Sequence, residues 1–151
     1  MTATRINHTS IVANSLEESA RFYEEVFGME RIPTAIFPDP VLWLRAGTNQ
    51  LHLFEADETA TLRAHVSFDV DDFDALYAKA KELGILDTRA FGSPLRVHPA
   101  GWAQLYLRDP AGNLIEVDWP DVSTLSPETL ADASELDGQD GEAATATLFT
   151  A

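Results

Sequence analysis

Three histidines and one glutamate in this sequence are candidate metal ligands. His8 and His52 lie in the first part of the chain, and His65 and Glu116 lie in the second part. Imidazole nitrogens and carboxylate oxygens are ligands of iron, nickel, cobalt, manganese and zinc, and the residue types alone do not choose among these metals. The chain contains no cysteine, so any metal must be bound through nitrogen and oxygen.

The four residues stand at equivalent positions of an internal repeat. His8-Thr9-Ser10-Ile11 opens the first copy and His65-Val66-Ser67-Phe68 opens the second, while Trp43-Leu44-Arg45 corresponds to Tyr106-Leu107-Arg108. His52 then corresponds to Glu116. A repeat of this kind indicates one supersecondary unit built twice. We therefore expect a single metal site made from two halves, with His8, His52, His65 and Glu116 as its ligands.

Each copy shows the pattern of a strand, a helix and further strands. In the first copy, residues 5–12 alternate as a strand, Asn14 or Ser15 can cap a helix that Gly28 ends, and residues 41–45 and 50–55 form a hairpin. In the second copy, residues 64–70 form a strand, residues 72–83 a helix, and residues 103–108 and 113–119 a closing hairpin. The order is β-α-β-β with room for one more strand, which predicts an α+β fold.

The alternation of residue types places the candidate ligands on the sheet face that the helices do not cover. Ala64, Val66 and Phe68 suit packing on the following helix, so His65 points to the other face, and by the repeat so does His8. Glu116 lies within an apolar strand and would be costly to bury unless it is paired or coordinated. A single strand histidine is usually a satisfied or exposed side chain. Four such residues at repeat-equivalent positions favour a metal site.

The composition excludes some classes of partner. Lys and Arg number 10 and Asp and Glu number 25, which gives a net charge of −15. Nucleic acids and anionic membrane surfaces require a basic surface, so we expect neither as a partner. Residues 121–151 hold seven acidic residues and no Lys or Arg. We interpret this acidic tail as a solubilising segment with a short helix within residues 126–136.

The 151 residues suffice for one domain with a sizeable core. No apolar run approaches the roughly 18 residues of a membrane span, and no basic-apolar leader indicates a signal peptide. We expect a cytoplasmic protein with a two-module domain in residues 1–120, the modules being residues 5–57 and 62–120.

The motifs resemble those of the vicinal oxygen chelate superfamily, which includes glyoxalases, bleomycin-resistance proteins and extradiol dioxygenases. The resemblance extends from residue 5 to about residue 120 and rests on residues 6–11, 19–23, 26–29, 65–68 and 107–116. It implies two βαβββ modules whose curved, mixed sheets surround a cleft. It also implies a divalent metal held by His8, His65 and Glu116, with His52 at a variable fourth position. In this family the metal chelates two neighbouring oxygens of a small substrate.

Departures from the family motifs leave open whether the enzyme is a lyase or isomerase, a dioxygenase or a thiol transferase. Bacterial glyoxalase I enzymes commonly carry a glutamate where this chain has His52. The site threonine of fosfomycin-modifying enzymes corresponds to Ser10, and extradiol dioxygenases usually have four modules. The alternative is a non-catalytic small-molecule binding or antibiotic-resistance protein of the bleomycin-binding type. Such proteins typically lack the metal ligands.

The resemblance also suggests catalytic groups besides Glu116. His98, Ser10 and Tyr106 are candidates to orient the substrate or to relay a proton, and the loop that carries His98 adjoins the cleft in this family. No nucleophilic side chain is indicated, because cysteine is absent and no Ser-His-acid arrangement is visible. We further expect a homodimer, since paired modules leave sheet edges and apolar surface to be covered.

Overall fold

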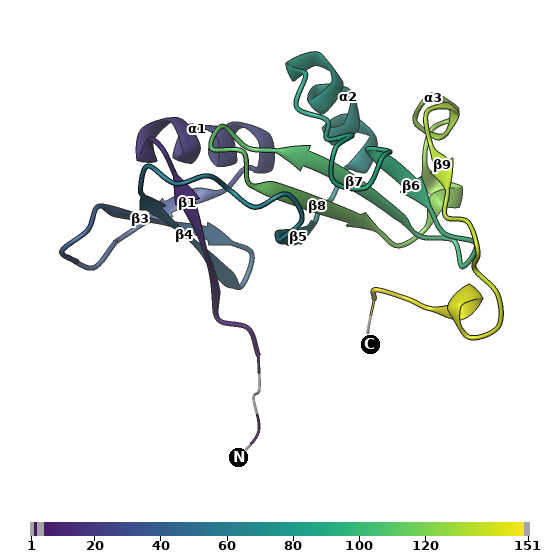
Figure 1. Ribbon diagram of the computed structural model, residues 1–151, viewed down its shortest axis with the longest axis horizontal. Helices are drawn as coiled ribbons and strands as arrows, with labels where there is room; N and C mark the ends of the chain where they lie inside the picture. Colours follow the sequence, from purple (N-terminus) through teal and green to yellow (C-terminus); the bar gives the residue numbers. More distant parts are fainter. Residues whose placement is uncertain (1, 3–4, 150–151) are drawn as a thin grey trace. The chain divides into compact units, whose positions relative to one another are not determined.

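The structure is a computed structural model that describes residue 2 and residues 5–149 (Figure 1). The chain forms two compact units, each with its own sheet. Unit 1 comprises Met1–Thr61 and Asp109–Asn113, and unit 2 comprises Leu62–Arg108 and Leu114–Ala151. None of the helices in the described part of the chain has the length and apolar character that a membrane crossing requires.

Unit 1 contains one helix and a four-stranded mixed sheet. The strand order is β1-β4-β3-β2, with β1 parallel to β4 and the other neighbours antiparallel. Strands β1 and β4 pair in the register that sets Ser10 opposite His52. In chain order the elements are β1 (His8–Ala13), α1 (Leu16–Phe27), β2 (Glu30–Ile32), β3 (Val41–Ala46) and β4 (Asn49–Glu55).

Unit 2 repeats this arrangement and adds a strand from the acidic tail. The strand order is β5-β8-β7-β6-β9, with β5 parallel to β8 and β9 parallel to β6. The elements are β5 (His65–Asp69), α2 (Phe73–Leu83), β6 (Leu95–Val97), β7 (Ala103–Arg108), β8 (Leu114–Trp119), η1 (Val122–Thr124), α3 (Pro127–Ala131), β9 (Ser134–Glu135) and η2 (Ala143–Thr145). Two modules of βαβββ type in an α+β fold are thereby confirmed.

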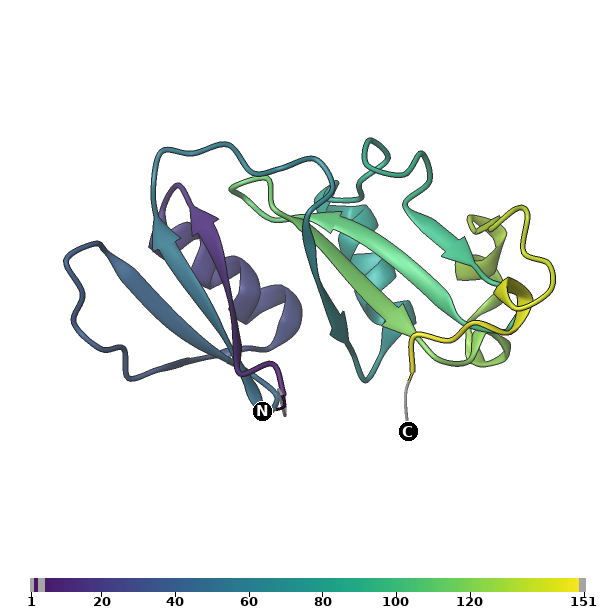
Figure 2. The ribbon, with the colours of Figure 1, turned by 60° about the horizontal axis from the view of Figure 1, so that its bottom comes forward.

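Each sheet has one apolar face covered by a helix, and the alternation of side chains along the strands leaves a second face for polar groups. Leu44, Leu51 and Leu53 are fully buried in unit 1, where α1 lies along the sheet (Figure 1). In unit 2, α2 lies against β7 and β8 (Figure 2). The buried side chains of α2 and of these two strands are Phe73, Leu76, Tyr77, Ala80, Leu105, Leu107, Ile115 and Val117.

Local signals fix where the two main helices begin and end. Ser15 caps α1 by accepting a hydrogen bond from the Glu18 backbone N–H, and Asp72 caps α2 in the same way through Ala75. Gly28 and Gly84 follow the last turns with φ of 62° and 67°, a left-handed conformation that glycine adopts at little cost. Of the two predicted caps for α1, Ser15 is the one used.

The turn of residues 109–113, between β7 and β8, belongs to the compact body of unit 1. Tyr23 of α1 is fully buried, and its hydroxyl donates to Asp109 Oδ2 at 2.9 Å. Asn113 Nδ2 donates to the same oxygen at 2.8 Å and to the Val12 carbonyl at 2.7 Å. Burial raises the pKa of Asp109, and these hydrogen bonds oppose the rise.

The positions of three short strands were not predicted from the sequence. Strands β2 and β6 lie beside prolines and are only three residues long. Three residues are too few to show the alternation of apolar and polar side chains that identifies a strand. Strand β9 has two residues and forms by pairing with β6. Helix α3 covers Pro127–Ala131, within the residues 126–136 where a short tail helix was expected.

Candidate metal centre

The first pair of predicted ligands, His8 and His52, lies on the polar face of the unit 1 sheet. Register sets His8 opposite Gln50 and Trp43 opposite His52. The rings of His8 and His52 stack with centroids 4.2 Å apart, and those of His52 and Trp43 stack at 4.5 Å. Three aromatic rings from three strands thus form one continuous stack, which fixes the planes of both imidazoles.

Hydrogen bonds and burial hold these imidazoles in a form that can bind a metal. His8 Nδ1 lies 3.0 Å from Asn7 Oδ1, and His52 Nε2 lies 2.8 Å from Gln50 Oε1. With the amide oxygens as acceptors, these nitrogens carry the protons, and the lone pairs stand on the other nitrogen of each ring. Burial, and then the neighbouring His8, lower the pKa of His52. A lowered pKa favours the neutral imidazole, which is the form that binds a metal.

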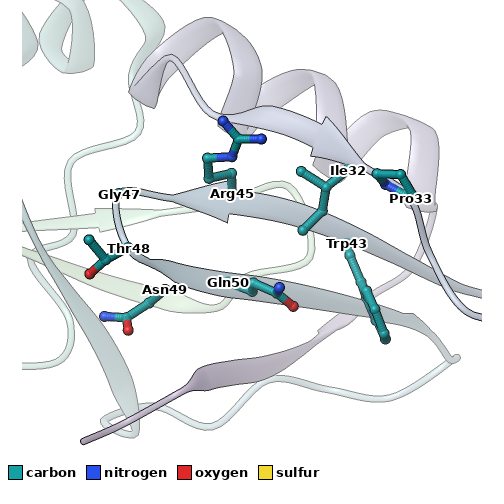
Figure 3. A pocket seen from close by; sticks show the side chains of 8 residues that line it. All are labelled: Ile32, Pro33, Trp43, Arg45, Gly47, Thr48, Asn49 and Gln50. Atoms are coloured by element: carbon teal, nitrogen blue, oxygen red, sulfur yellow. The ribbon is translucent and has the colours of Figure 1, made fainter.

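A pocket of about 400 Å³ opens beside this stack in unit 1 (Figure 3). Trp43 belongs both to the pocket wall and to the ring stack. Its Nε1 is buried and has no hydrogen-bond partner within the described residues. The lining mixes apolar and polar residues from the end of β2, from β3 and β4 and from the turn between these two strands. It consists of Ile32, Pro33, Trp43, Arg45, Gly47, Thr48, Asn49 and Gln50.

The second pair of predicted ligands, His65 and Glu116, lies on the polar face of the unit 2 sheet. His65 Nδ1 is 2.7 Å from the Arg63 carbonyl oxygen, which can only accept, so Nδ1 carries a proton. His65 Nε2 is 3.2 Å from Glu116 Oε2. In the neutral imidazole this nitrogen presents a lone pair to a buried carboxylate. Two electron-rich atoms at this distance repel each other unless a proton or a metal ion is shared between them.

The residues around Glu116 orient its carboxylate. Glu116 is 5% exposed, and Gln104 Nε2 donates to its Oε1 at 2.7 Å. Tyr106 stands directly opposite Glu116 in the register, and burial together with this carboxylate raises the pKa of its hydroxyl well above the usual value. Tyr106 therefore stays protonated and can donate.

A second carboxylate, Asp118, lies on the same face two residues further along β8. The Ser67 hydroxyl donates to Asp118 Oδ2, while Oδ1 is buried and has no hydrogen-bond partner within the described residues. Burial raises the pKa of Asp118 to about 7, and the nearby Glu116 adds to this rise.

The other predicted catalytic residues are placed differently. Ser10 is exposed on β1, opposite His52. His98 is buried in unit 2, where its ring stacks on Trp102 with centroids 4.3 Å apart. Its Nδ1 accepts from the Ala100 N–H at 3.0 Å, and its Nε2 faces Gln139 Oε1 at 3.1 Å. Both nitrogens of His98 are thus engaged in contacts within unit 2.

The structure therefore brings the four predicted ligands together as two pairs, one in each unit. Within the part of the chain that the structure describes, no group of three or more His, Asp or Glu side chains is arranged to hold a metal. The chemistry of each pair nevertheless fits a divalent cation. One pair offers two stacked imidazoles, and the other offers an imidazole nitrogen facing a buried carboxylate.

Sequence reasoning did not identify three polar residues beside the predicted site residues. Gln104 and Ser67 bind Glu116 and Asp118, and Gln50 binds His52. Each stands two residues from a predicted site residue on the same strand, or directly opposite one. The alternation rule that placed the ligands on this face would have found these neighbours as well.

Comparisons with known proteins agree with this fold and these motifs. The sequence profile of the Glyoxalase/Bleomycin resistance protein/Dioxygenase superfamily matches residues 5–117. This match spans most of the chain, and the chain belongs to this superfamily, as the sequence motifs indicated.

Three individual proteins illustrate the relationship. Glyoxylase I 4 of Arabidopsis thaliana is 30% identical over 127 residues, which are 76% of this chain and 70% of that protein. The metallothiol transferase FosB of Lysinibacillus sphaericus is 32% identical over 92 residues, which are 57% of this chain and 64% of that protein. The crystal structure of lactoylglutathione lyase from Agrobacterium tumefaciens has a TM-score of 0.60 and 26% identity, covering 78% of this chain and 94% of that one.

Proposed function

We propose that this protein is a metal-dependent enzyme that acts on a small molecule by coordinating two of its neighbouring oxygens. The proposed ligands are His8, His52, His65 and Glu116. The observation that carries the proposal is the contact of 3.2 Å between His65 Nε2 and Glu116 Oε2, with His65 Nδ1 already bound to a carbonyl. A shared proton or a metal ion would satisfy this pair, and a histidine held through its other nitrogen is the usual arrangement of a metal ligand.

A divalent ion would act as an electrophile that stabilises negative charge on substrate oxygens. Gln104 holds Glu116 so that one carboxylate oxygen faces His65. Tyr106 keeps its proton and is a candidate donor of a hydrogen bond to the substrate. Ser10, exposed opposite His52, is a second candidate. The contacts of His98 support a role in holding the segment around Gln139 more than a role in proton transfer.

The reaction type stays open among lyase or isomerase, dioxygenase and thiol transferase. The names of two relatives, glyoxylase I and metallothiol transferase, support a metalloenzyme but differ in reaction. His52 stands where bacterial glyoxalase I enzymes commonly carry glutamate, which weighs against that particular reaction. A panel of hemithioacetals, catechols, and fosfomycin with thiols would identify the class.

The experiment is to strip the purified protein of metal, reload it with Mn²⁺, Zn²⁺, Ni²⁺, Co²⁺ or Fe²⁺, and assay each form against the panel. We expect turnover that disappears on stripping and returns with a rate that depends on the metal. Stripped protein that turned over its substrate at the full rate would overturn the mechanism. Reloaded protein that bound panel compounds without converting them would instead identify a binding or resistance protein.

We also propose that the protein is a homodimer in the cytoplasm. Strand β1 stands at one edge of its sheet and β5 at one edge of the other, and open edges are commonly covered by pairing. Sedimentation should give a dimer at micromolar concentration, and a monomer under these conditions would count against the proposal. Cell fractionation tests the location.

A further inference from the structure

A stacked pair of rings, His98 and Trp102, stands on the polar face of the unit 2 sheet. The antiparallel register that sets Arg96 opposite Gln104 continues to this ring pair, where the His98 N–H donates to the Trp102 carbonyl oxygen at 2.8 Å. By the alternation of side chains along a strand, both rings lie on the face of Gln104, which donates to Glu116. Residues two apart in a strand are about 7 Å apart. The ring pair is therefore a neighbour of the residue that holds a candidate metal ligand.

The last part of the acidic tail contacts this ring pair. We call residues 137–149, which come after β9, the strap. His98 Nδ1 accepts from a backbone N–H, so Nε2 carries the proton and donates to Gln139 Oε1 at 3.1 Å. Trp102 Nε1 donates to the Ala146 carbonyl oxygen at 2.7 Å. Figure 1 shows the strap on the side of the unit 2 sheet away from α2, so it lies over the polar face at the turn between β6 and β7.

The strap covers the ring pair. His98 is 4% exposed and Trp102 is 8% exposed, although both stand at a hairpin turn, and turns generally run over the surface of a protein. One ring nitrogen of each residue is bonded to the strap. The superfamily profile ends at residue 117, so the strap lies outside the part of the chain that this match covers. The covering of this face is therefore a feature of this chain that the match does not explain.

Few contacts hold the strap in place. Leu136, just before it, donates its N–H to the Val97 carbonyl oxygen at 2.9 Å and extends the pairing of β9 with β6. Beyond this point, among the residues that the structure describes, the bonds of Gln139 and Ala146 are the two hydrogen bonds that join the strap to the rest of unit 2. Most strap residues are exposed. A segment with few buried contacts opens locally at little cost in free energy, so the strap can leave the polar face while unit 2 stays folded.

We propose that the strap is a gate, latched on His98 and Trp102, that limits the access of small molecules to the polar face of unit 2 and admits them when it opens. The part of this statement that makes the admitted molecule a substrate rests on the proposed function. The gate itself depends on no metal, because the groups that hold it lie outside the proposed ligand set. His98 then serves as a latch for the strap.

The test measures access with a single introduced thiol, which is possible because the chain contains no cysteine. Arg96→Cys places the thiol on β6, two residues before His98, and the rate of its reaction with N-ethylmaleimide is followed in the full-length, metal-free protein. Trp102→Phe then removes the indole donor to the strap and keeps an aromatic ring beside His98. We expect the thiol of Arg96→Cys to react about two- to tenfold faster when Trp102→Phe is added, because the latch loses the net contribution of one hydrogen bond.

Trp119→Phe is the matched control, because it removes the same N–H group from a tryptophan of the same unit. Trp119 Nε1 donates to the Asp121 carbonyl oxygen and to the Thr124 hydroxyl, which lie outside the strap, so the reaction rate should stay unchanged. Gln139→Ala removes the partner of His98 from the strap side and leaves the buried rings intact, and it should raise the rate like Trp102→Phe.

A thiol on the other side of the sheet shows whether the effect is local. Glu82→Cys places it on the exposed surface of α2, where neither release variant should change the rate. Circular dichroism of each variant checks its folding. An unchanged rate at Arg96→Cys in both release variants, or an equal rise at Glu82→Cys, would overturn the proposal.

Binding of Mn²⁺, measured by electron paramagnetic resonance, separates this proposal from the proposed function. Trp102→Phe should bind Mn²⁺ with the affinity of the wild type, since its indole nitrogen contacts the strap and none of the proposed ligands. Faster labelling in the release variants without Mn²⁺ binding to any of the proteins would leave the gate standing and refute the metal centre. Mn²⁺ binding together with an unchanged labelling rate would do the reverse.

Discussion

Removing the Tyr23 hydroxyl tests how unit 1 holds the turn of residues 109–113. Tyr23 is fully buried and donates to Asp109, which is 5% exposed and has a pKa raised by burial. Tyr23→Phe removes one hydrogen bond to a buried charged group and leaves almost no cavity. Such a bond contributes about 1.5–3 kcal/mol to the free energy of unfolding. We expect a loss of this size.

Tyr77→Phe is the matched control, because it removes a hydroxyl at the same distance from an aspartate. Tyr77 donates to Asp132 at 2.9 Å, but the side chain of Asp132 is 44% exposed and is also bound by Lys81. Water can replace the lost bond there, so the loss of stability should be clearly smaller. The assay is urea unfolding followed by circular dichroism and by tryptophan fluorescence, with each variant compared in the transition of its own unit.

The effect of Tyr23→Phe should also depend on pH. The hydrogen bond from Tyr23 opposes the rise in the pKa of Asp109, so its removal raises that pKa further. A carboxyl whose folded-state pKa is raised loses stability as pH increases through the range between its unfolded and folded values. The penalty should therefore be full at neutral pH and shrink once Asp109 is protonated. Equal losses in the two variants at neutral pH, or a penalty that grows on acidification, would refute the reasoning.

Three further outcomes follow from the structure. Asp87→Asn should cost about 1.5–3 kcal/mol, because the buried Asp87 accepts from Arg108 Nε at 2.9 Å; urea unfolding measures this. Although burial alone would raise the pKa of Asp87, the hydrogen bonds from Arg108 and Ala90 hold it below the usual value. Its contribution is thus present above the unfolded-state pKa and lost as pH falls through the folded one, and Asp87→Asn should flatten this part of the stability profile. Ser15→Ala should cost about 1 kcal/mol by removing the cap of α1, whereas Asn14→Ala should leave the capping bond intact, as the same assay would show.

The sequence sufficed to predict the parts of the fold that depend on local signals. The caps of α1 and α2, the glycines that end them and the alternation along β5 and β8 all follow from short-range patterns. Strands β2, β6 and β9 exist through pairing with neighbours that lie elsewhere in the chain. A segment of two or three residues carries too little pattern to show this in advance.

The candidate site, too, was predicted only in part. The repeat and the alternation placed His65 and Glu116 on one face, and the structure sets them 3.2 Å apart. Two other features depend on the register between strands, which cannot be read from the sequence. They are the stacking of His8, His52 and Trp43 and the hydrogen bond from Gln104 to Glu116.

The central claim is that Glu116 and His65 bind a divalent metal ion, and the most direct measurement is metal stoichiometry after titration. Stripped wild-type protein, Glu116→Gln and Glu82→Gln are titrated with Zn²⁺ or Mn²⁺, desalted and analysed for metal. Glu82 is an exposed residue of α2 and controls for the loss of one carboxylate. The account predicts one tightly bound ion per protein chain in the wild type and in Glu82→Gln, and the loss of that ion in Glu116→Gln. Unchanged stoichiometry in Glu116→Gln would contradict it.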